Sequence, residues 1–134
     1  MLEFLWGLSW FFEDQLLLTT IVLLALAFLK LKRRTALVIA LALALLFTHA
    51  VKGVYNEARP CFGESFCPDE GLSGFPSGHT TVAFIFIMAS IGSAWFALYL
   101  PLGLLMMASR VWIGVHSIPQ VAGGAVLGIL FYSI

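Results

Sequence analysis

The chain has 134 residues, of which 61% are hydrophobic and only 10% are charged. A soluble domain of this length usually carries about a quarter of its residues as charged side chains. The composition therefore excludes an ordinary soluble protein and indicates an integral membrane protein. The formal net charge is zero, and since no basic tract suggests nucleic acid, we expect none as a partner. The length favours one domain, residues 1–134.

Apolar segments in chain order predict an all-α membrane bundle of about five transmembrane helices. Residues 1–14 carry Trp6 and Trp10 and end in two acids, so we expect an interfacial helix there rather than a first span. The first span is expected over residues 15–31. The basic residues in 30–34 should face the cytoplasm by the positive-inside rule, which puts the N-terminus outside.

The second span is expected over residues 35–54, and it returns to the outside. Residues 56–76 are polar, hold Gly, Pro and four acids, and predict an exterior loop. Cys61 and Cys67 in this loop could pair as a disulfide in an oxidising exterior or stay free thiols. The third span should begin near Ser77, a candidate N-cap behind Pro76, and run to about residue 94. The fourth runs from about residue 97 to residue 115, and Pro119 opens the fifth.

The placement of charge in the chain points to an anion site. All seven acids lie at or before Glu70, and from residue 71 onward Arg110 is the one formally charged side chain. Inserting an isolated arginine into a membrane costs about 2.5–3.5 kcal/mol on insertion scales. A bound anion is the first candidate to offset that cost. The expected topology brings together five side chains at the outer ends of the spans: Lys52, Arg59, His79, Arg110 and His116.

These residue types suit an anion with several oxygens, such as a phosphoryl group. Arg59 and Arg110 can each donate forked hydrogen bonds to phosphate, and a lysine adds a point charge. The backbone N–H groups of Gly78 and His79, at the start of a helix behind Ser77, form an anion cradle. One histidine can attack phosphorus while another protonates the leaving oxygen. No cluster of acids offers a metal site, so we expect chemistry without metal or cofactor.

Three motifs carry a resemblance to a known family. The chain resembles the type 2 phosphatidic acid phosphatase superfamily, the membrane lipid phosphatases related to vanadium haloperoxidases, whose motifs are K-x6-RP, PSGH and SR-x5-H-x3-D. Here they read "KGVYNEARP" (52–60), "PSGH" (76–79) and "SRVWIGVHSIPQ" (109–120). Their order and spacing match over residues 35–134, which is the motif-bearing core.

The resemblance implies a role for each matching residue. His116 would be the nucleophile that forms a phosphohistidine, and His79 would be the general acid for the leaving group. The residues expected to bind the phosphoryl oxygens are Lys52, Arg59, Ser77, Gly78 and Arg110.

The chain departs from the family at two points. The family usually has six spans rather than five, and Gln120 stands where the third motif has an aspartate. A glutamine can orient His116 through its carbonyl oxygen, but it supplies no negative charge. One of the loop acids could reach over instead: Glu57, Glu64, Asp69 or Glu70.

We therefore expect a phosphohydrolase acting on a lipid phosphate or diphosphate, with a preference for isoprenyl or other simple lipid phosphates. Its site should face the outside of the cell membrane. Two alternatives stay open. The phosphoryl group on His116 could pass to another lipid, or Gln120 could leave a pseudoenzyme that binds anionic lipid heads without turnover.

Overall fold

The structure is a computed structural model that describes residues 33–67 and 71–134, together with residues 3, 4, 7, 20, 24 and 26. Within residues 33–67 and 71–134 all regular secondary structure is helical. The helices are α3 (Arg34–Tyr55), α4 (Gly78–Ser90), α5 (Phe96–Trp112) and α6 (Ile118–Ser133). They correspond to the second, third, fourth and fifth expected spans. The expected interfacial helix and first span lie almost wholly outside the described residues.

The helices differ in length, and a five-span bundle is not confirmed. By length and composition, α3 with 22 residues is the one helix in the described part of the chain that is long and apolar enough to cross a membrane. The other three are shorter apolar helices. Helix α4 has 13 residues, which at 1.5 Å per residue gives about 20 Å against about 30 Å of hydrocarbon.

Helix α4 ends at residue 90 rather than near residue 94 because local hydrogen bonds close its last turn. The hydroxyl of Ser90 donates to the Ile87 carbonyl at 2.7 Å, and the hydroxyl of Ser93 donates to the Ser90 carbonyl at 2.7 Å. Gly92 then takes a φ of +78°, a left-handed conformation that glycine adopts without steric cost and that stops the helix.

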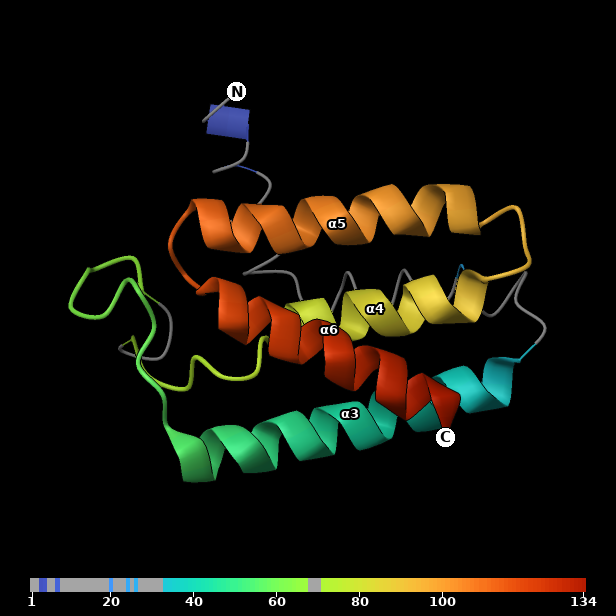
Figure 1. Cartoon of the computed structure of the whole chain (residues 1–134), viewed down its shortest axis with the longest axis horizontal. Coiled ribbons are helices and arrows are strands. Elements are labelled where there is room, and N and C mark those ends of the chain that lie inside the picture. Colours follow the sequence, from blue (N-terminus) through green and yellow to red (C-terminus); the bar gives the residue numbers. More distant parts are fainter. Residues whose placement is uncertain are drawn as a thin grey trace.

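Each helix runs in the opposite direction to the one before it (Figure 1). Helix α4 contacts all three others and packs most closely against α6. Small residues allow the close approach of α4 and α6. A Cβ added at Gly124 would overlap the backbone of Ser77, and one at Gly128 would overlap the Thr81 carbonyl and the Phe84 side chain. The "GGAVLG" segment thus packs α6 against α4 as its small residues suggest.

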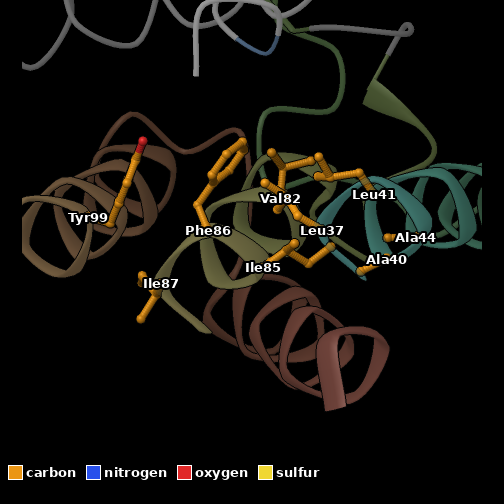
Figure 2. Packing of buried hydrophobic residues seen from close by; sticks show 9 residues of the cluster. All are labelled: Leu37, Ala40, Leu41, Ala44, Val82, Ile85, Phe86, Ile87 and Tyr99. Carbon is orange, nitrogen blue, oxygen red and sulfur yellow. The ribbon is translucent and has the colours of Figure 1, made fainter. Parts of the chain in front are cut away.

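The apolar core lies between α3, α4 and α5 (Figure 2). Helix α3 contributes Leu37, Ala40, Leu41 and Ala44, whose spacing of three and four residues forms one stripe along a helix. Figure 2 shows this stripe against Val82, Ile85 and Phe86 of α4, with Tyr99 of α5 on the far side of Phe86.

The outward faces of the bundle are also apolar. Leu46 and Val54 of α3 are 71% and 89% exposed, and large apolar side chains are exposed on α5 and α6 as well, among them Leu104 and Leu130. Water does not favour apolar surface of this extent, whereas lipid chains do. The composition and the outer faces together indicate a membrane location.

Candidate active site

The motif residues gather at one end of the bundle. The C-terminal end of α3, the start of α4, the end of α5 and the start of α6 all lie at the same end in Figure 1, next to the loop that follows α3. Lys52 lies in the last turn of α3, and Arg110 in the last turn of α5. The antiparallel order of the helices therefore brings together residues that are far apart in the sequence.

Residues 113–117, between α5 and α6, explain the spacing of Arg110 and His116. Ile113 donates its backbone N–H to the Ser109 carbonyl at 3.1 Å, and Gly114 then turns the chain with a φ of +78°. After this turn the backbone N–H of His116 donates to the Arg110 carbonyl at 3.1 Å. The helix end thus folds the histidine back over the last turn of α5, beside the arginine.

His116 is buried and lies within the field of three cations. Only 2% of the residue is exposed. Burial, followed by the positive charge of Arg59, lowers the pKa of His116 to about 3, and Lys52 and Arg110 lower it further. A hydrogen bond to Gln120 acts in the opposite direction. The imidazole is therefore neutral at physiological pH, which is the form that can act as a nucleophile.

Ser77, Gly78 and His79 stand at the start of α4. Ser77 is the N-cap residue and is fully buried. Its backbone N–H donates to the backbone carbonyl oxygen of Gln120 at 3.1 Å. Its side-chain oxygen accepts a hydrogen bond from the Thr80 hydroxyl at 3.1 Å. Gly78 and His79 are half-buried in the first turn. The contact between Ser77 and Gln120 holds the first turns of α4 and α6 next to each other.

The loop after α3 begins at Asn56, whose left-handed φ of 34° ends the helix. Arg59 is buried in this loop, and its Nε donates to the Leu72 carbonyl at 3.1 Å. Its backbone N–H donates to the Gly71 carbonyl at 2.7 Å. Cys61 and Cys67 are joined in a disulfide, with 5.5 Å between their Cα atoms. The loop is therefore tied to itself at Arg59 and again just after it, between Cys61 and Cys67.

Gln120 has the contact to His116 that the third motif predicts. Its Oε1 lies 3.2 Å from Nδ1 of His116, and its Nε2 donates to a carboxylate oxygen of Glu57 at 2.8 Å. Of the two loop acids that the structure describes, Glu57 and Glu64, it is Glu57 that reaches the motif, and it does so through Gln120. Glu64 is exposed, and Asp69 and Glu70 lie outside the described residues.

The structure adds residues that the sequence did not single out. Ala58 accepts a hydrogen bond from Gln120 through its carbonyl, and Gly74 lies so close that a Cβ there would overlap the Gln120 amide. Glu57 lies two positions before Arg59 within the first motif. For Glu57 the sequence did carry a signal: Gln120 replaces the aspartate of the third motif, so an acid near a motif could supply the missing negative charge. The backbone contacts of Ala58 and Gly74 have no such signal.

The described part of the chain contains no group of three or more His, Cys, Asp or Glu side chains that could hold a metal ion. The roles of the two histidines and of the phosphate-binding set stay predictions.

Apolar helices thus carry a buried neutral histidine among cations at one end of the bundle, in a protein whose composition and outer faces indicate a membrane location. Comparison with known proteins gives the family. The sequence model of the PAP2 superfamily matches residues 33–134, so the chain belongs to the PAP2 superfamily, as its three motifs indicate. This places it among the membrane lipid phosphatases in general.

A solved structure has the same fold over nearly the whole chain. The crystal structure of Aquifex aeolicus LpxE is similar with a TM-score of 0.79 and 25% sequence identity. The alignment covers 97% of this chain and 81% of that chain.

Proposed function

We propose that this protein is a membrane phosphohydrolase that removes phosphate from a lipid phosphate or diphosphate through a phosphohistidine on His116. One observation carries the proposal. A buried imidazole contacts a side-chain amide at Nδ1 and lies within the field of Arg59, Lys52 and Arg110. A neutral nucleophile surrounded by cations is suited to attack a phosphoryl group that several negatively charged oxygens surround.

The cations would bind the phosphoryl oxygens and stabilise the charge that these oxygens carry in the transition state. Arg59 is held through Nε by the Leu72 carbonyl, and Arg110 is 1% exposed at the end of α5. The backbone N–H groups at the start of α4, at Gly78 and His79, add the positive end of a helix dipole.

The reaction would proceed in two displacements at phosphorus. First, Nε2 of His116 attacks, a P–N bond forms, and the bond between phosphorus and the leaving oxygen breaks while His79 gives that oxygen a proton. The alcohol or the shorter phosphate leaves. Water then attacks the phosphohistidine and passes a proton to His79, and the P–N bond breaks to release inorganic phosphate. The two histidines return to their starting states.

A lipid is the substrate class that the surroundings of the site support. The helices that carry the motifs expose apolar side chains along their outer faces, so a lipid chain in the bilayer could lie against them while its headgroup reaches the site. The part of the chain that the structure describes offers little polar structure beyond the loop after α3 for reading a large headgroup. Isoprenyl phosphates and other simple lipid phosphates fit this best.

The site would face the outside of the cell membrane. Arg33 and Arg34 lie at the start of α3, at the opposite end of that helix from Lys52, and the positive-inside rule favours the cytoplasm for them. The disulfide between Cys61 and Cys67 also favours an oxidising exterior. After reduction, these thiols in intact cells should react with an impermeant maleimide. Labelling only after the membrane is opened would place the site inside.

The function is tested by phosphate release from the purified protein in detergent. The substrates would be phosphatidate, phosphatidylglycerol phosphate and isoprenyl mono- and diphosphates, with EDTA present throughout. His116→Asn is the control variant, because an asparagine N–H can still donate to Gln120. We expect release that survives EDTA and is lost in His116→Asn.

The remaining outcomes decide between the alternatives. A phosphorylated lipid acceptor with little free phosphate would favour a phosphotransferase that uses the same histidine. Saturable binding of the lipid phosphates with no turnover by the wild type would favour a binding protein. Release that continues in His116→Asn would refute the proposed mechanism.

A further inference from the structure

The side-chain amide of Gln120 uses its whole hydrogen-bonding capacity. Its Oε1 accepts from the backbone N–H of Ser117 at 3.0 Å and contacts Nδ1 of His116 at 3.2 Å. Its Nε2 donates to Glu57 Oε1 at 2.8 Å and to the Ala58 carbonyl at 3.0 Å. The residue is 1% exposed, so no water competes for these positions. An amide with two donors and two acceptor sites is thereby satisfied in full.

The chemistry of these partners determines which way the amide points. The Ser117 N–H can only donate, while a carboxylate and the Ala58 carbonyl can only accept. If the amide were flipped, its N–H₂ would face the Ser117 N–H, and its oxygen would face the carboxylate of Glu57. Each of these two mismatched contacts would leave buried polar groups without partners, which costs about 1–3 kcal/mol per group. Glu57 is the partner that makes the flip most unfavourable, because it carries a full charge.

The orientation of the amide in turn determines the tautomer of His116. The atom that faces Nδ1 is Oε1, the side-chain amide oxygen of Gln120, and this oxygen can only accept a hydrogen bond. Nδ1 of the neutral ring must therefore carry the proton, and Nε2 keeps its lone pair. A ring in the other tautomer would have two acceptors facing each other and a protonated, unreactive Nε2.

We propose that Glu57 is a positioning residue of the active site. Its carboxylate acts through the amide of Gln120 to hold His116 in the tautomer that leaves Nε2 free, and it offsets the positive charge that the ring gains in the phosphohistidine. Glu57 and Gln120 together thus replace the aspartate of the third motif. The catalytic purpose of this pair rests on the proposed function, because tautomer and charge matter only if His116 attacks phosphorus.

The backbone around Glu57 is held in place for this contact. Its carbonyl accepts the backbone N–H of Gly74 at 2.7 Å, which ties the segment after α3 to the segment before α4. At Gly74 a Cβ would overlap Gln120, so a glycine there provides the space through which the amide reaches Glu57. The side chain of Glu57 is half-buried, which strengthens its charged hydrogen bond relative to one in water.

The carboxylate would act on the reaction by polarising the amide. A charge-assisted hydrogen bond at Nε2 makes Oε1 a stronger acceptor, since linked hydrogen bonds reinforce each other by about 10–30%. The gain is largest when the ring is positively charged, as it is once phosphorus is bound to Nε2. The pair should therefore lower the barrier to phosphohistidine formation more than it changes substrate binding.

The direct test is the tautomer of His116 by NMR. Protein labelled with ¹⁵N-histidine is studied in detergent micelles as wild type, Glu57→Leu and Glu57→Gln, and His116→Asn identifies the His116 signals. The control is Glu64→Leu, which removes an exposed acid from the same loop. We expect protonated Nδ1 in the wild type, Glu57→Gln and Glu64→Leu. In Glu57→Leu the Ser117 N–H and the Ala58 carbonyl still favour the same amide orientation. We therefore expect a weaker preference for protonated Nδ1 there than in the wild type, with protonated Nε2 detectable.

The second arm measures kcat and KM on the best lipid phosphate. Glu57→Gln can still accept from Gln120 but has lost its charge, and a hydrogen bond to a charged group is about twice as strong as a neutral one. We therefore expect kcat to fall about tenfold. KM should be unchanged or lower, because the cations that bind the substrate remain. A loss of structure would move both constants and the melting temperature, and Glu64→Gln should move none of them.

The outcomes separate this inference from the proposed function. An Nδ1-protonated His116 in Glu57→Leu identical to that of the wild type would overturn the control of the tautomer by Glu57. An unchanged kcat in Glu57→Gln would overturn the electrostatic role of its carboxylate. If Glu57→Leu does not fold, the kcat of Glu57→Gln decides. If the wild type releases no phosphate from any lipid, the proposed function fails, and the NMR spectra still decide whether Glu57 controls the tautomer.

Discussion

The backbone N–H of His116 donates to the carbonyl oxygen of Arg110, 3.1 Å away, so the end of α5 positions both motif residues at once. The turn that makes this contact possible passes through Gly114 in the left-handed region. Nothing crowds the space beside Gly114, since a Cβ there would meet no atom within 4 Å. Backbone conformation is therefore the reason for a glycine at this position.

We predict that Gly114→Ala lowers activity through the backbone alone. A left-handed alanine costs about 1–2 kcal/mol, and relief of that strain would move His116 away from the Arg110 carbonyl. Asparagine tolerates this region far better, so Gly114→Asn should recover most of the activity. Steady-state kinetics of the two variants measure the difference. Equal losses in both would show that the left-handed turn is not what positions His116.

Gly74→Ala should disturb the site by a different route. Its Cβ would overlap the amide of Gln120 and push that side chain off Glu57 and His116. We expect kcat to fall about ten- to hundredfold. Gly53→Ala on α3 is the matched control, because a Cβ there meets nothing within 4 Å, and it should keep the wild-type kcat. Wild-type kcat in Gly74→Ala would mean that the position of the amide is unimportant.

Exchanging the acid and the amide tests the relation between Glu57 and Gln120. In Gln120→Glu alone, two carboxylates would meet where one hydrogen bond of 2.8 Å now lies, and like charges at that distance cannot both ionise without cost. We expect kcat to fall at least tenfold. Adding Glu57→Gln restores a donor, so the double variant should be more active than Gln120→Glu. A double variant with additive losses would show that the two residues act independently.

The buried neutral state of His116 predicts a loss of stability in acid. Burial and the charge of Arg59 lower its pKa to about 3 in the folded protein, against about 6.5 in the unfolded chain. Between these values the unfolded chain binds a proton that the folded protein does not. The free energy of unfolding should therefore fall as pH drops below about 6.5, by up to about 1.4 kcal/mol per pH unit.

Melting temperatures of wild type and His116→Asn in detergent, from pH 7.5 to 4.5, measure this contribution. Asparagine does not titrate, so the variant should lose less stability than the wild type across that range. Parallel curves for the two proteins would show that His116 takes up its proton in the folded state as readily as in the unfolded chain.

Local signals predicted much of the fold. Ser77 behind Pro76 predicted the start of α4, and Pro119 lies in the first turn of α6 as expected. Hydropathy placed the four described helices, because apolar runs reflect burial in lipid or core. It overestimated α4, because the side-chain hydrogen bonds of Ser90 and Ser93 close that helix early, and an apolar run does not reveal which serine will bond to a carbonyl.

In the candidate site, the sequence predicted the contact between neighbours in one motif but not the contact between distant segments. Matching motifs predicted that Gln120 would orient His116, since the two lie four residues apart in the third motif. The contact between Glu57 and Gln120 spans 63 positions and depends on how the loop after α3 folds over the start of α6. No periodicity or spacing in the sequence encodes that approach. The space at Gly74 is equally invisible, because it arises only when the two segments meet.

The most direct measurement is to trap the phosphorylated protein during turnover of a ³²P-labelled lipid phosphate. A phosphohistidine survives alkali and is lost in acid, so the reaction would be quenched within milliseconds in alkaline detergent and the protein separated from lipid. We expect alkali-stable, acid-labile label on the wild type, mapped to the peptide that contains His116, and none on His116→Asn. A wild type that turns over without ever carrying label, or label that persists in His116→Asn, would contradict the proposed mechanism.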